Sequence, residues 1–213
     1  MRGGLGSGAD DGLGEGDGSA ALLQNLIHVT KEQEFGKLDD GESCSLTVME
    51  LQAALKGQYK AGLAMLRQCV EDCPDDLWAL APSGHPRTFW RIAYHALFYT
   101  HLYLMPMKSD FVPWEKHQSQ ATCLWDDDEE GIPPEETTYS KSEVLSYLDW
   151  IVKQVDAWVD ALDLASPKSG FSWYRIPKLD HQLVNLRHLG THTGQLQELL
   201  FARGMDSNWI GRR

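Results

Sequence analysis

Apolar residues recur at intervals of three and four in two stretches of the chain, one after Thr47 and one after Ser140. The first stretch contains Leu51, Leu55, Tyr59, Gly62, Leu66 and Val70. The second contains Val144, Leu148, Ile151, Val155, Val159 and Leu162. This spacing places each set on one face of an α-helix. Each stretch opens with a capping box, Thr47 with Glu50 and Ser140 with Glu143, which predicts where each helix begins.

Two further segments have helical patterns. Residues 87–104 follow Pro86 and are apolar on nearly every face, which is typical of a buried helix that Pro106 ends. The last helix is expected over 179–203, with Gly204 at its C-terminal cap. Because the chain has four such segments and no pattern typical of a strand, it predicts an all-α fold, a four-helix bundle.

A long connection over residues 105–139 joins the second and third helices. It is long enough to recross the bundle and so allows these two helices to be parallel, whereas the shorter connections on either side favour antiparallel neighbours. Its acidic run 126–130 resembles the opening of a calcium-binding loop. The twelfth position is Thr137 rather than Glu, and Pro133-Pro134 interrupt the pattern, so we interpret the run as solvated charge.

Composition narrows the classes of partner. The formal net charge is -12, which argues against nucleic acid and anionic membranes as partners. No apolar run approaches the roughly 20 residues of a membrane span, and the N-terminus lacks a secretory pattern, so we expect a cytoplasmic protein with reduced cysteines. Residues 1–44 form a glycine-rich, acidic arm that we expect to be flexible, 45–204 the bundle, and 205–213 a C-terminal tail.

Three histidines are candidate metal ligands. His188 and His192 are four residues apart on the last helix, which places two imidazoles on one face. His95 lies in the middle of the second helix, the most buried one, and bundles build metal sites from inward side chains of facing helices. Such histidines are also common as polar surface or hydrogen-bonded core groups. His181 and His101 compete for the same role, and we rank both below the chosen three.

Residues 90–104 around His95, followed about ninety residues later by Arg187-His188-x-x-x-His192-x-x-Gln195, resemble the DinB/YfiT-like superfamily. The resemblance covers roughly residues 47–204 and implies a DinB-like four-helix bundle. It also implies that His95, His188 and His192 bind one divalent cation, zinc or nickel, with water in the open positions. Relatives often carry a second histidine where this chain has Thr191, but His192 keeps the ligand position.

The resemblance identifies the metal-binding residues more firmly than it identifies a reaction or a substrate. Several members are thiol-dependent transferases or isomerases that use low-molecular-weight thiols, so we expect a metal-dependent enzyme with a small-molecule substrate. Arg91, Tyr94 and Tyr99 are candidates for orienting an anionic substrate, Arg91 and Tyr99 foremost. Gln195 is either a residue that supports His192 or a surface amide.

Several alternatives stay open. One is a non-catalytic bundle that binds metal structurally or senses it, and another is an interaction module without metal. Cys69 on the first helix is the one residue that could close the coordination sphere and make a structural site. A homodimer is also left open.

Overall fold

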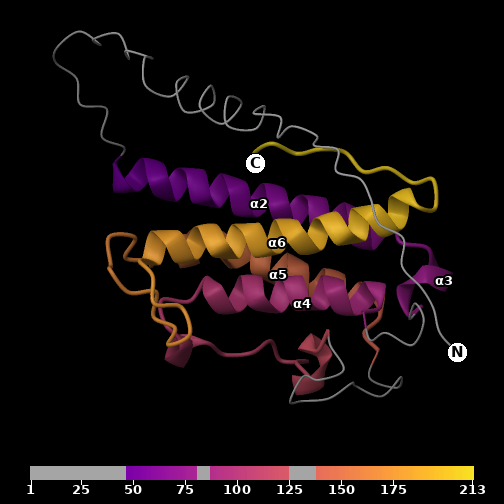
Figure 1. Ribbon diagram of the computed structural model, residues 1–213, viewed down its shortest axis with the longest axis horizontal. Helices are drawn as coiled ribbons and strands as arrows, with labels where there is room; N and C mark the ends of the chain where they lie inside the picture. Colours follow the sequence, from indigo (N-terminus) through magenta and orange to yellow (C-terminus); the bar gives the residue numbers. More distant parts are fainter. Residues whose placement is uncertain (1–46, 81–86, 125–137) are drawn as a thin grey trace, which may run out of the picture. The chain divides into compact units, whose positions relative to one another are not determined.

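The computed structural model describes residues 47–80, 87–124 and 138–213, and these ranges are helical, with no strand (Figure 1). The long helices are α2 (Val48–Asp72), α4 (Phe89–Tyr103), α5 (Lys141–Asp160) and α6 (Lys178–Phe201). The connections hold one short helix, α3 (Asp75–Trp78), and the 3-10 turns η2 (Lys108–Asp110) and η3 (Ser119–Thr122). The prediction of an all-α fold is confirmed. The predictions for the N-terminal arm and for the acidic run concern residues outside the described ranges.

The capping boxes lie where the sequence predicts them. Thr47 Oγ1 accepts from the backbone N–H of Glu50 at 3.2 Å, and the Glu50 carboxylate accepts from the Thr47 N–H at 2.7 Å. Ser140 and Glu143 make the same pair of bonds at the start of α5. Beyond the end of α6, Gly204 has a φ of 73°, a left-handed conformation that glycine adopts without strain.

Two pairs of long helices that follow each other in the chain, α2 with α4 and α5 with α6, lie diagonally across the bundle. Helix α2 packs against α5 and α6, and α4 packs against the same two helices (Figure 1). The expectation that α2 and α4, and likewise α5 and α6, would be close neighbours was therefore wrong. The physical reason is that the first connection carries structure of its own: Trp78 of α3 donates to the Tyr139 carbonyl at 2.7 Å and packs on Phe89 at 5.9 Å between ring centroids. Helix α3 is thereby held at the end of the bundle where α4 and α5 begin.

Helices α4 and α5 run in the same direction, as the long connection between them permits. Trp90 and Tyr139, at the starts of the two helices, are 5.8 Å apart between ring centroids. His101 and Trp158, near the ends, are 4.9 Å apart. The chain after α4 must therefore return along the bundle before α5 begins.

Helix α4 is buried, as predicted, and its side chains fill the core with large rings. Among the largest fully buried side chains, Phe89, Trp90 and Tyr94 come from α4, and Tyr59 and Tyr147 join them from α2 and α5. Buried tyrosines need partners for their hydroxyls. Tyr59, for example, donates to Oε1 of Gln182 on α6 at 2.8 Å.

Three of the four cysteines lie in the described residues, and all three are buried free thiols: Cys69, Cys73 and Cys123. Burial raises the pKa of Cys69 and of Cys73 to about 12, so both stay protonated at neutral pH. Cys44 lies outside the described residues. Within the same ranges, the helices are too short or too polar to span a bilayer.

Candidate metal centre

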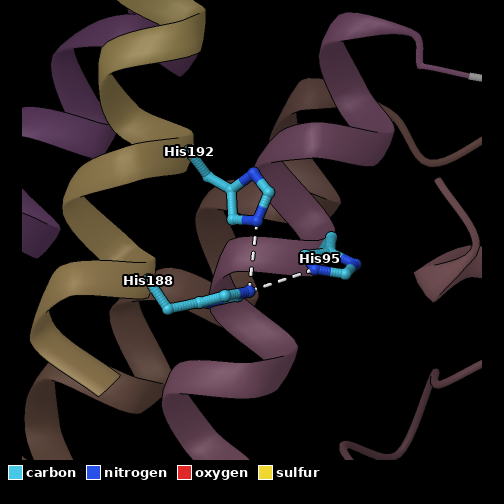
Figure 2. Close-up of side chains that lie close together, drawn as sticks. All are labelled: His95, His188 and His192. Carbon is cyan, nitrogen blue, oxygen red and sulfur yellow. Dashed lines mark hydrogen bonds between the residues drawn. The ribbon is translucent and has the colours of Figure 1, made fainter. Parts of the chain in front are cut away.

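Three imidazoles from two helices meet at one point between α4 and α6 (Figure 2). His95 comes from α4, and His188 and His192 come from consecutive turns of α6. The Nε2 atom of His188 lies 3.2 Å from Nε2 of His95 and 3.1 Å from Nε2 of His192. One nitrogen from each of the three lies within 4.8 Å of the others, a group that could hold a metal ion.

Two buried amides set the register that brings these helices together. Gln182 donates to the carbonyl of Tyr103 at 2.9 Å, and Asn185, one turn later on α6, donates to the carbonyl of Thr100 at 3.2 Å. Because α4 and α6 are antiparallel, the next turn of α6 places His188 opposite His95. Neither amide was among the residues that the sequence analysis singled out, since a polar residue on a helix face gives no sign of its partner.

Hydrogen bonds to the outer ring nitrogens determine the tautomers of two histidines. Nδ1 of His95 lies 2.7 Å from the carbonyl oxygen of Thr122, which can only accept, so Nδ1 carries the proton. Nδ1 of His192 lies 2.9 Å from Oε1 of Gln195, and Arg87 donates to the same oxygen at 2.7 Å. In a neutral imidazole the other nitrogen is then an acceptor. The Nε2 lone pairs of both rings therefore point into the group.

The surroundings favour the neutral form of these histidines. Burial, with a smaller contribution from neighbouring His192, lowers the pKa of His188 to about 4. Burial also lowers the pKa of His192. Neutral imidazole is the form that binds metals.

The nitrogens fit a divalent cation. Zinc binds imidazole nitrogen at about 2.0–2.1 Å, so two nitrogens of a tetrahedral site are about 3.3 Å apart. The Nε2 separations of 3.2 and 3.1 Å are close to this value. A proton on Nε2 of His188 would have to be shared between the two lone pairs, whereas a cation can bind all three nitrogens. In the described ranges no carboxylate or thiol joins the group, and buried Cys69 is not part of it.

Arg91 and Tyr99, the foremost candidates for substrate contacts, lie one helical turn before and one turn after His95 on α4. The ring of Tyr99 is 4.6 Å from that of His95 and 5.4 Å from that of His188, centroid to centroid. Arg91 is buried, and its guanidinium lies 5.1 Å from the centre of the Trp90 ring. Tyr94 instead faces away from the group, because its hydroxyl bonds Nδ1 of His117 at 2.7 Å.

The two competing histidines are elsewhere. His101 bonds the Tyr147 hydroxyl through Nδ1 at 2.9 Å. His181 is buried among Tyr103, Phe171 and Tyr174, with ring centroids 4.8 to 5.2 Å away. Neither contributes a nitrogen to the metal-binding group.

Sequence reasoning missed two of the groups that orient the three histidines. Arg87 could not be linked to Gln195 from the sequence, because the two residues are 108 positions apart. The carbonyl of Thr122 is a backbone group, and a backbone acceptor has no residue signature. Gln195 itself was found, since it lies one turn beyond His192.

The profile of the DinB superfamily matches residues 58–196, which is more than half of the chain. A search of curated proteins and a search of solved structures each found no significant match.

Proposed function

Because the chain belongs to the DinB superfamily, we propose that it is a metal-dependent enzyme that binds one divalent cation through His95, His188 and His192. Its substrate would be a small molecule, handled together with a low-molecular-weight thiol as in a thiol transferase or isomerase. The observation that carries the proposal is the convergence of three Nε2 atoms, two of them kept unprotonated by acceptors at Nδ1.

Zinc and nickel are the preferred candidates for the cation, because both accept imidazole ligands. A bound cation with an open position supplies a Lewis acid that lowers the pKa of a coordinated thiol or water. The protein's part is to hold the three rings rigidly. Thr122 and Gln195 fix two of them through Nδ1, and such bonds to the outer nitrogens of ligands usually raise metal affinity.

Arg91 and Tyr99 are proposed as substrate contacts. Tyr99 packs against two of the three histidines, so a ligand that reaches the group would meet its ring or hydroxyl. Arg91, one turn before His95, would supply positive charge for an anionic substrate. We also propose a cytoplasmic location, because buried free thiols suit a reducing compartment.

Metal content tests the site. Untagged wild-type protein is expected to retain about one divalent ion per chain by elemental mass spectrometry, and His188→Ala is expected to lose it. Thr191→Ala changes an exposed residue on the same turn of α6 and should keep the metal. Equal metal content in wild-type protein and His188→Ala would refute the proposed ligands.

The response of a cobalt-substituted sample separates an enzyme from a non-catalytic metalloprotein. An open coordination position predicts a change in the visible cobalt spectrum when azide or a small thiol is added, because the new ligand alters the coordination sphere. Tyr99→Phe should weaken the thiol response while leaving the metal bound. A spectrum that does not change with either ligand would favour a closed, structural site.

A further inference from the structure

A cavity lies on the side of α4 that faces α5, and it has no residue in common with the metal-binding group. It has a volume of about 420 Å³, in the range of small-molecule sites. Its walls come from the end of α4, from α5 and from residues 110–115 of the long connection. The residues that matter for its chemistry are His101, Asp110, Trp114, Glu115, Trp150 and Trp158.

The walls of this cavity are aromatic, with three indole rings and one imidazole. Trp150 and Trp158 meet nearly at right angles, at 71° with centroids 5.3 Å apart. His101 stacks on Trp158 at 4.9 Å and meets Trp150 edge-on at 4.9 Å. Trp114 is held in place by stacking on Tyr147 at 4.8 Å. Trp150 and Trp158 are only partly buried although their apolar area is large, so both keep ring surface that a ligand can cover.

The charge around the cavity is negative. Asp110 and Glu115 line it and are both exposed, and no lysine or arginine is among its described lining residues. Burial lowers the pKa of His101 to about 4, so this ring is neutral at pH 7. Lys116 follows Glu115 in the chain, and its ammonium pairs with Glu143 at 3.7 Å and lies 6.0 Å from the centre of the Trp114 ring. A ligand in the cavity would therefore meet indole faces and carboxylates, and no cationic side chain is among the described lining residues.

We propose that this cavity binds an organic cation of the methylated ammonium class. Indole is the aromatic ring that attracts cations most strongly, and cages of aromatic rings are a recognised means of binding quaternary ammonium groups. The carboxylates of Asp110 and Glu115 would add long-range attraction at the rim. A neutral aromatic ligand would gain nothing from them.

The position of the polar groups favours a methylated over a primary ammonium. A primary ammonium has three N–H donors, each of which needs an acceptor when it is buried. The carboxylates here lie at exposed positions, whereas the inner walls are rings and the Met105 side chain. A trimethylammonium group has no N–H to satisfy and presents methyl groups to the rings.

Calorimetric titration with choline tests the proposal, and its neutral isostere 3,3-dimethylbutan-1-ol is the matched ligand. Choline should bind saturably at one site per chain, and the isostere at least about tenfold more weakly, because only the charge differs. Trp158→Leu and Glu115→Gln should each weaken choline binding several-fold. Glu115 is exposed, so its variant is expected to fold even where Trp158→Leu does not.

Two controls place the site. Trp209→Leu removes an indole that is 82% exposed and is not among the residues lining the cavity, and should leave choline affinity unchanged. His188→Ala should also leave it unchanged, which separates this site from the metal-binding group. Equal affinity for choline and its isostere, absence of saturable choline binding, or loss of binding in His188→Ala would each overturn the proposal.

Discussion

The Nδ1 atom of His192 lies 2.9 Å from the side-chain oxygen of Gln195, one turn further along α6. The same oxygen accepts from Arg87 at 2.7 Å, which identifies it as the oxygen rather than the nitrogen of the amide. Gln195 therefore decides which nitrogen of His192 carries the proton. It leaves Nε2 free on the side where His188 and His95 converge.

Gln195→Ala is expected to weaken metal binding by about 10- to 100-fold without displacing any ligand, because His192 loses the acceptor that fixes its tautomer. Competition with a chromophoric chelator measures this change. Gln195→Glu keeps an acceptor for both His192 and Arg87 and should retain most of the affinity. Metal affinity that is unchanged in Gln195→Ala would mean that the bond does not orient the ligand.

Local sequence signals predicted the helices well because they act within one turn of the chain. The capping boxes at Thr47 and Ser140 and the glycine after α6 satisfy backbone groups of their own helix, so their effect can be read without knowing the fold. The three histidines were also found from the sequence. Spacing on one helix gave two of them, and the family resemblance supported His95.

Long-range relationships could not be predicted in the same way. The diagonal arrangement of α2 and α4 depends on how Trp78 anchors the connection between them, and a connection's length alone does not fix this. The acceptor of His95 is the backbone of Thr122, which any residue could supply. The cavity on the α5 side combines Trp114 from the long connection with Trp150 and Trp158 from α5. The sequence does not reveal this grouping, because aromatic residues most often belong to the hydrophobic core.

Gly170 has a φ of 89°, and a Cβ atom there would lie 2.2 Å from the Pro106 carbonyl oxygen. Gly170→Ala should therefore be strongly destabilising, by about 2 kcal/mol or more, because both the backbone and its neighbour would have to move. Gly190→Ala is the matched control, since a Cβ atom there meets nothing within 4 Å inside α6. It should stabilise the protein by roughly 0.5–1 kcal/mol. Urea denaturation measures the free energy of unfolding of both variants. Similar changes in the two would contradict the packing described for Gly170.

Lys178 is buried, and its ammonium donates to the carbonyl of Pro106 at 2.6 Å and to that of Ser169. Lys178→Met keeps most of the side-chain volume but leaves both carbonyls without this donor, which should cost roughly 2 kcal/mol of the free energy of unfolding. Lys168→Met alters an exposed lysine on the loop that precedes α6 and should change stability little. Equal melting temperatures of the two variants would show that the buried hydrogen bonds of Lys178 contribute less to stability than this value.

The stability of the protein should fall in acid because of His101, which is 2% exposed and whose pKa burial lowers from 6.5 to about 4. Between these two pH values His101 binds a proton in the unfolded chain but stays neutral in the folded protein. Acid therefore stabilises the unfolded chain relative to the folded protein. The contribution of His101 is fully present above pH 6.5, declines as the pH falls toward 4, and changes no further below that.

His101→Gln removes the titrating ring, and the amide can still bond the Tyr147 hydroxyl. Urea unfolding of wild-type protein and this variant at pH 7 and pH 4.5 isolates the effect of His101, because other groups titrate in both. The loss of unfolding free energy on acidification should be smaller in the variant by about 2–3 kcal/mol. The variant is expected to be less stable than wild type at pH 7, since it loses stacking on Trp158. Equal acid sensitivity of the two proteins would show that His101 can take up a proton in the folded state without cost.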